Sequence, residues 1–233
     1  SGKLSTDKDL KGSTRLSDCT IDIGAYEYQG TSIGECIKPK DNGQHQILYV
    51  TELGKGKKDG SSWENAVNGL DYPLKWANEN KDLFTEVKPL HIYIAKGIYK
   101  PMYSPEDGNF TTIPDDLRDK AFLMVENVEL YGGFSGKETN LAQRDFKNNE
   151  TILSGDLIGN DNNDIDVIDF VSDETRKDNV YHVVVAANTT AVKTVLNGVK
   201  IKDGNANNHS YINVNGVIVM RNRGGGVFSS STS

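Results

Sequence analysis

The sequence predicts an all-β fold, a right-handed parallel β-helix (a solenoid) with one capping α-helix near its N-terminus. The prediction rests on four short apolar, β-branched runs, each of which ends in Gly or Asn-Gly. These runs lie within residues 90–97, 125–133, 151–155 and 194–201. Strands of this length, separated by polar turns, suit a stack of coils. The composition agrees, since 36% hydrophobic residues and 23 glycines fit a narrow core with many turns.

The first part of the chain is polar and contains one expected strand, residues 20–28, which alternates at period two. A linker rich in Gly and Pro follows at residues 29–46. We therefore expect two units: residues 1–40, a polar segment with one strand, and residues 41–233, the cap and the first coils of the β-helix.

The only convincing helix spans residues 70–80 and follows a short strand at residues 47–50. Asp71 is the expected N-cap, and Pro73 stands in the first turn, where its missing N–H costs nothing. Leu74 and Trp76 belong to the apolar stripe of this helix. We expect the helix to cover the first coil, whose open end would otherwise invite aggregation.

Further strands are expected near residues 92, 128, 152, 183 and 196. The run at residues 181–187 is continuously apolar, as in a strand with both faces covered. A long polar insertion separates the first two of these strands at residues 103–119.

The charge pattern restricts the class of partner. The net charge is −7, and residues 156–178 hold eight acidic residues against two basic ones. Nucleic acid is not an expected partner, because phosphate binding needs grouped Lys and Arg. A transmembrane segment is not expected either, since no apolar run approaches the roughly 20 residues that a bilayer requires.

The acidic loop after residue 155 suggests a structural calcium ion. Ca²⁺ prefers six to eight hard oxygen ligands, which carboxylates, Asn side chains and carbonyls supply. The expected metal ligands are Asp156, Asp161, Asp164 and Asp166. The spacing matches no EF-hand loop, and the alternative is a solvated turn, because Asp and Asn tolerate turn geometry.

Five residues are the expected ligand-binding side chains of an exposed face: Tyr99, Tyr103, Lys200, Lys202 and Asp203. The two tyrosines flank Pro101 and are expected to be exposed, so that their rings could stack on sugars. The two lysines share a strand face, and Asp203 follows at the end of that strand. The same arrangement also occurs on any solvated strand, and we expect no catalytic residues.

The chain has two cysteines, Cys19 and Cys36. Their spacing matches no zinc site. They could form a disulfide in an oxidising compartment or remain two thiols.

A family resemblance rests on a series of motifs in a specific order. They are residues 49–50, 59–66, 92–101, 130–139, 144–145, 151–156, 178–184 and 224–226. The stretch from Leu48 to Gly226 resembles the head of the right-handed parallel β-helix surface proteins of Gram-negative bacteria, a group that includes polymorphic outer-membrane proteins and adhesins.

A second motif stands at an unusual place. Residues 9–15 with residues 20–27 resemble the motif that usually closes such a β-helix near its C-terminus. Its position implies that residues 1–40 are the tail of a preceding unit and that the next unit is truncated at its C-terminus.

The resemblance implies secretion and an extracellular, outer-membrane-associated location, but no particular reaction. The expected function is a non-catalytic surface module for adhesion to a glycan or a surface protein. One alternative is a polysaccharide-active lyase or glycoside hydrolase, and another is a structural spacer. End-to-end self-association through an open coil is also expected to be possible.

Overall fold

The computed structural model describes residues 16–17, 20–21, 37–108, 110–162, 164, 173–188 and 193–231. Its strands are β1 (Leu16–Ser17), β2 (Thr20–Ile21), β3 (Lys40–Asp41), β4 (Gln46–Thr51), β5 (Val67–Asn68), β6 (Leu90–Ala95), β7 (Gly97–Tyr99), β8 (Phe122–Leu123), β9 (Val128–Phe134), β10 (Thr151–Ser154), β11 (Val184–Asn188), β12 (Val195–Asn197), β13 (Lys200–Lys202), β14 (Tyr211–Val214), β15 (Val217–Met220) and β16 (Val227–Ser231).

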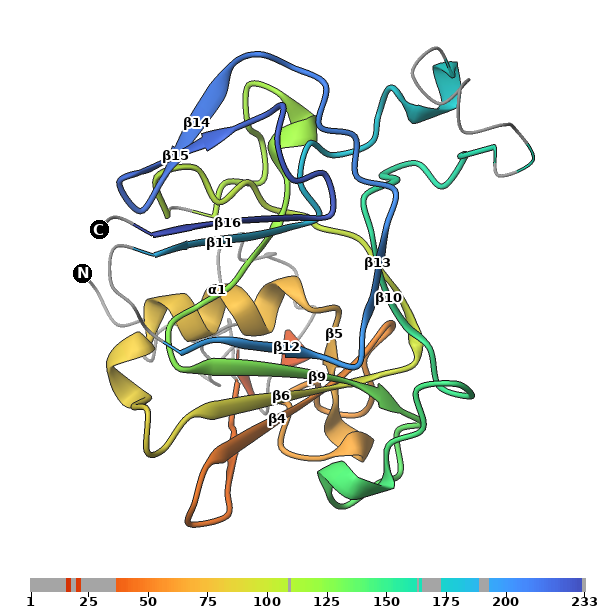
Figure 1. Cartoon of the computed structure of the whole chain (residues 1–233). Coiled ribbons are helices and arrows are strands. Elements are labelled where there is room, and N and C mark those ends of the chain that lie inside the picture. Colours follow the sequence, from red (N-terminus) through yellow and green to blue (C-terminus); the bar gives the residue numbers. More distant parts are fainter. Residues whose placement is uncertain are drawn as a thin grey trace, which may run out of the picture.

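One α-helix, α1 (Asp71–Glu79), is present among the described residues (Figure 1). Short 3-10 helices interrupt the loops: η3 (Trp63–Asn65), η4 (Lys81–Leu83), η5 (Glu106–Gly108), η6 (Leu117–Asp119), η7 (Leu141–Gln143) and η9 (Glu174–Arg176).

Parallel pairing dominates three of the sheets. The largest has the order β12-β9-β6-β4-β3 with β5 beside β4, and only the β3–β4 pair in it is antiparallel. Two smaller parallel sheets have the orders β13-β10-β7 and β16-β11-β8. Between β6 and β13 the chain visits these sheets in turn, so residues far apart in sequence become neighbours (Figure 1).

The predicted fold class is wrong. The strands of the described residues divide among five small sheets of mixed parallel and antiparallel pairing, instead of one continuous right-handed solenoid. Two of the sheets are antiparallel pairs, β1–β2 and β14–β15. The prediction failed because a short β-branched run indicates a strand but does not determine which strands become its neighbours.

The positions of several elements were predicted correctly. The expected strands near residues 48, 92, 128, 152 and 196 are β4, β6, β9, β10 and β12, and the apolar run at 181–187 contributes to β11. The helix is also confirmed, although Leu70 is its N-cap and Asp71 is its first residue. Its predicted role as the lid of a solenoid is withdrawn together with that fold.

The main core lies between the sheets and the helix. The largest side chains with almost no exposure include Phe122, Leu48, Leu74 and Leu130, which come from four different elements or loops. A second cluster is mostly aromatic, in which the rings of Tyr93 and Phe134 stack with centroids 4.6 Å apart. Both clusters are rigid supports for the loops that follow the strands.

Most of residues 1–40 lies outside the described part of the chain, including Cys19 and Cys36 and most of the expected strand at 20–28. The two-unit division therefore stays a prediction. Among the helices that the structure describes, none has the length and apolar character needed to cross a bilayer.

Candidate functional site

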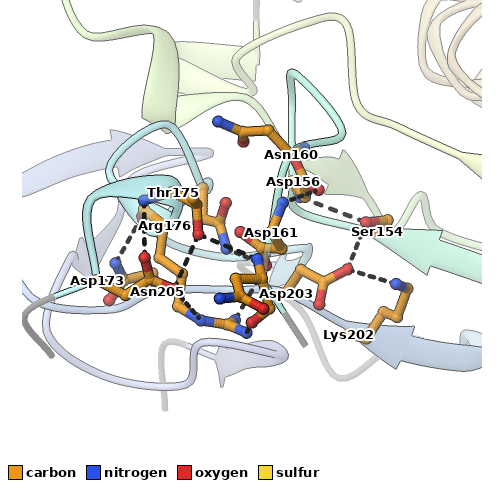
Figure 2. Close-up of polar contacts among 12 residues, drawn as sticks. Ser154, Asp156, Asn160, Asp161, Asp173, Thr175, Arg176, Lys202, Asp203 and Asn205 are labelled. Atoms are coloured by element: carbon orange, nitrogen blue, oxygen red, sulfur yellow. Dashed lines mark hydrogen bonds and ion pairs between the residues drawn. The ribbon is translucent and has the colours of Figure 1, made fainter. Parts of the chain in front are cut away.

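The acidic loop and the end of β13 meet because β10 and β13 are parallel neighbours. Their register places Ser154 opposite Lys202, so the residues that follow each strand lie side by side. Gly155 permits this approach, since a Cβ there would lie 2.3 Å from the carbonyl oxygen of Asp203. Asp203 itself has a left-handed backbone conformation with φ of 63°. Figure 2 shows the resulting group of polar side chains.

Asp156 closes the turn that begins the acidic loop. Its Oδ1 accepts hydrogen bonds from the backbone N–H groups of Gly159 and Asn160, and its Oδ2 accepts one from Asp161 at 3.2 Å. Asp156 is only 7% exposed. An Asp that accepts bonds from the following backbone stabilises a turn in this way.

Asp161 is held by the segment that contains η9. Its Oδ2 accepts hydrogen bonds of 3.0 Å from Arg176 Nη1 and from Asn179 Nδ2. Burial raises the pKa of Asp161, and the nearby negative charges of Asp156 and Asp203 raise it further, while Asn179 and Arg176 act in the opposite direction. Arg176 is itself buried and also donates to the carbonyl of Asn162.

Asp203 completes the group at the end of β13. Its Oδ2 accepts a hydrogen bond of 2.8 Å from Ser154 Oγ and lies 2.9 Å from Lys202 Nζ. Lys200, two residues earlier, extends to Glu150 at 2.6 Å and is exposed. The two lysines of β13 therefore pair with different carboxylates, and only Lys202 belongs to the site.

The two expected ligand-binding tyrosines are not exposed. Tyr99 is 3% and Tyr103 is 7% exposed, so the prediction of open rings beside Pro101 is wrong. Tyr99 pairs in register with Leu153, on the inner side of its sheet, and its hydroxyl donates to the carbonyl of Ala95 at 2.9 Å. Tyr103 packs edge-on against Tyr72 and Phe110.

The expected calcium ligands are placed only in part. Asp156 and Asp161 lie together, Asp164 is exposed, and Asp166 lies outside the described residues. Both oxygens of Asp156 and the Oδ2 of Asp161 already accept N–H groups, so a cation bound to them would have to displace those donors. In the described residues, no group of three or more His, Cys, Asp or Glu side chains is arranged to hold a metal ion. The calcium hypothesis stays a prediction.

Sequence reasoning missed the arginines that tie this region together. Besides Arg176, Arg118 donates from Nε to the carbonyl of Asn179 at 2.6 Å and from Nη2 to the carbonyl of Asn205 at 2.7 Å. Its guanidinium carbon lies 4.1 Å from the centroid of the Tyr181 ring. These partners are 61 and 87 residues away from Arg118, so the chain offers no local signal for them.

A scan against family models found no matching family, and comparisons with curated proteins and with solved structures found no match either.

Proposed function

We propose that this chain is a non-catalytic binding module that contacts glycans at a cell surface. The observation that carries the proposal is that each carboxylate of the candidate site is already held by donors of the protein itself. Asp156, Asp161 and Asp203 each accept hydrogen bonds from backbone or side-chain groups of the protein. A catalytic carboxylate must instead exchange a proton or a bond with its substrate, so this arrangement favours a rigid support over a reaction centre.

The outer face of the β7–β10–β13 sheet offers a contact surface. The register places Ile98, Ile152 and Lys200 in one row across the three strands, and the first and last of these are exposed. Neighbouring strands are about 4.8 Å apart, so the row is a short, flat strip. Such a strip suits many weak contacts with an extended polymer, in which avidity rather than one deep pocket gives the binding strength.

The alternative, a polysaccharide-active enzyme, is favoured by one observation. The pKa of Asp161 is raised by its burial and by the charges of two further carboxylates, which is the environment of a general acid. Hydrolysis by an acid and a base of this kind would use two of the three carboxylates.

The proposal on location follows from the family resemblance and places the chain outside the cell, associated with the outer membrane. The partner is then a glycan or a surface protein. Self-association is a further part of the proposal, because β12, β13 and β16 are edge strands among the described residues. An unpaired edge offers backbone groups to a second chain.

A glycan array combined with two activity assays tests the function. We expect saturable binding of the chain to a subset of glycans, with no release of reducing ends or unsaturated uronates. We also expect Lys200→Glu to weaken array binding, while Lys177→Glu, on the exposed part of another loop, leaves it unchanged.

Turnover of any polysaccharide would replace the binding module by the enzyme. If the chain neither binds nor turns over any glycan, the spacer hypothesis would replace both. Light scattering at increasing protein concentration tests self-association separately.

A further inference from the structure

A small hollow lies between the start of α1 and the end of β7. Its lining includes Asp71 and Tyr72 from the helix, Tyr99, Lys100 and Met102 from the segment after β7, and Glu52 from the loop after β4. Its volume is about 180 Å³. Pockets for drug-sized ligands begin at about 300 Å³, so this hollow accommodates one small ring and not a chain.

The hollow contains a carboxyl group that the fold does not need for an ion pair. Asp71 is 5% exposed, and its Oδ1 accepts a hydrogen bond of 2.7 Å from the backbone N–H of Met102. No ion pair to Asp71 is present among the described residues. A buried carboxyl without a cation lowers stability, so its presence in a concave site indicates a functional role.

Burial raises the pKa of Asp71 to about 7, while the N–H groups of Met102 and of Asp71 itself and the charge of Lys120 oppose the rise. Near neutral pH this carboxyl can therefore donate a hydrogen bond as well as accept one.

The charged groups of the lining nearly cancel. Glu52 supplies one negative charge and Lys100 one positive charge, and among the described residues the hydrogen bonds of both are long. Glu52 Oε2 accepts from Ile98 N–H at 3.4 Å, and Lys100 Nζ donates to the carbonyl of Leu157 at 3.4 Å. Bonds at this limit are weak, so either side chain can turn to a ligand at low cost. A strongly charged ligand would meet one charge of each sign.

The remaining lining is apolar. Tyr99 is buried, and its hydroxyl is occupied by the carbonyl of Ala95, so it adds no free polar group to the lining. Met102 is 48% and the neighbouring Ile98 is 46% exposed at the rim. Apolar side chains beside convergent polar groups match a ligand with one apolar face and an edge of hydroxyls.

We propose that this hollow binds a single neutral sugar ring or a polyol of similar size, with Asp71 and Lys100 hydrogen-bonding its hydroxyls and with Ile98 and Met102 against its C–H face. A hydroxyl group both donates and accepts, which fits a lining that contains an ammonium donor and two carboxyl acceptors. The inference rests on the proposed function, glycan contact, and assigns one site to it.

An NMR titration of the ¹⁵N-labelled chain with methyl glycosides of neutral hexoses tests the site. We expect saturable shifts of the Met102 and Gly69 amides. Asp71→Asn keeps the shape of the side chain but removes its charge, and it should weaken the affinity about tenfold, which is the value of one hydrogen bond to a charged group. Lys100→Met, on the partly exposed rim, should weaken it to a similar extent and serves if Asp71→Asn fails to fold.

Lys177→Met is the matched control, because Lys177 is exposed and lies outside the lining and outside the strip on the β7–β10–β13 sheet. Its affinity for the glycosides should equal that of the unmodified chain. Absence of saturable shifts at Met102, or equal affinities of all variants, would overturn the sugar site.

The outcomes separate this inference from the function on which it rests. Array binding without shifts at Met102 would leave the binding module intact and refute the site in the hollow. Shifts at Met102 without any array binding would support the hollow and refute the surface function.

Discussion

Asp161 shows how this protein keeps a buried carboxylate in place. One of its oxygens accepts bonds from a guanidinium and from an amide, both delivered by the segment around η9. Removing both donors would leave this buried oxygen without them, at a cost of about 1–3 kcal/mol. Asp156 is held by three backbone N–H groups of its own turn.

Gly155 is the residue on which the meeting of β10 and β13 depends, and Gly155→Ala should destabilise the protein. The added Cβ would lie 2.3 Å from the Asp203 oxygen and 2.8 Å from Val180 Cγ2, so backbone has to move. Overpacking of this kind costs about 1–3 kcal/mol, measurable as a lower urea midpoint.

Gly226→Ala is the matched control for this substitution. A Cβ at that position would meet Ile201 Cγ2 at 3.6 Å, an ordinary contact, and its effect should stay within about 0.5 kcal/mol. Equal midpoints for the two variants would show that the close approach at Gly155 is not a constraint.

The hairpin of β14 and β15 is the element that sequence analysis overlooked. The sequence contains its signal, because Asn215-Gly216 stands between two apolar runs. In the structure both residues have positive φ, at 51° and 77°. Such a pair is typical of the two-residue hairpin turn. The first strand of the hairpin also alternates, with Ile212 and Val214 buried and Tyr211 and Asn213 exposed.

We expect Gly216→Ala to destabilise the hairpin and the core beneath it. A left-handed conformation costs an alanine about 1–2 kcal/mol, and Val217 and Val219 of this hairpin are buried. Gly216→Asn should lose clearly less, because Asn tolerates positive φ. Thermal unfolding followed by circular dichroism compares the two variants, and equal losses would mean that side-chain volume, not backbone conformation, is responsible.

The helix was predicted for the right reason at the right place, but the role of Asp71 was not. A carboxylate beside the start of a helix usually caps it. Here Leu70 occupies the N-cap position and Asp71 instead holds the N–H of Met102, 31 residues later. Local sequence can locate a helix start, but a partner from another segment decides what the side chain does.

The buried histidines should contribute a loss of stability between neutral pH and pH 4, because they resist protonation, whereas the raised pKa of Asp71 acts in the opposite direction. Burial and the stacked His45 lower the pKa of His91 from its ordinary value of 6.5 to about 4. Burial also lowers the pKa of His182. Above pH 6.5 these histidines are neutral in the folded and in the unfolded state. As the pH falls towards 4, the unfolded state binds protons that the folded state does not.

We expect this loss to amount to at least about 1 kcal/mol, or a Tm lowered by about 2–4 °C at this chain length. His91→Gln should reduce the dependence of Tm on pH in this range, whereas a change at the exposed His209 should not. An unchanged pH profile of His91→Gln would show that this residue does not contribute.

For the whole molecule, the sequence predicted the positions of strands better than it predicted how the strands pair into sheets. Apolar runs located β4, β6, β9, β10, β11 and β12, since each run reflects the burial of its own side chains. The choice of neighbour depends on contacts such as Ser154 with Lys202, 48 positions apart, and no local pattern encodes them. The same limit applied to the site: the acidic loop was visible, but Arg176 and Asn179 acquire their roles only when the segments meet.

The guanidinium of Arg118 joins three stretches of chain, through the carbonyls of Asn179 and Asn205 and the side chain of Asn207. Removing this guanidinium would deprive the carbonyls of both Asn179 and Asn205 of a hydrogen-bond donor. Fluctuations of these loops are therefore coupled: one cannot swing outward on its own while the others stay docked. The free energy needed for a ligand or a protease to displace one loop would therefore include the contacts of all three.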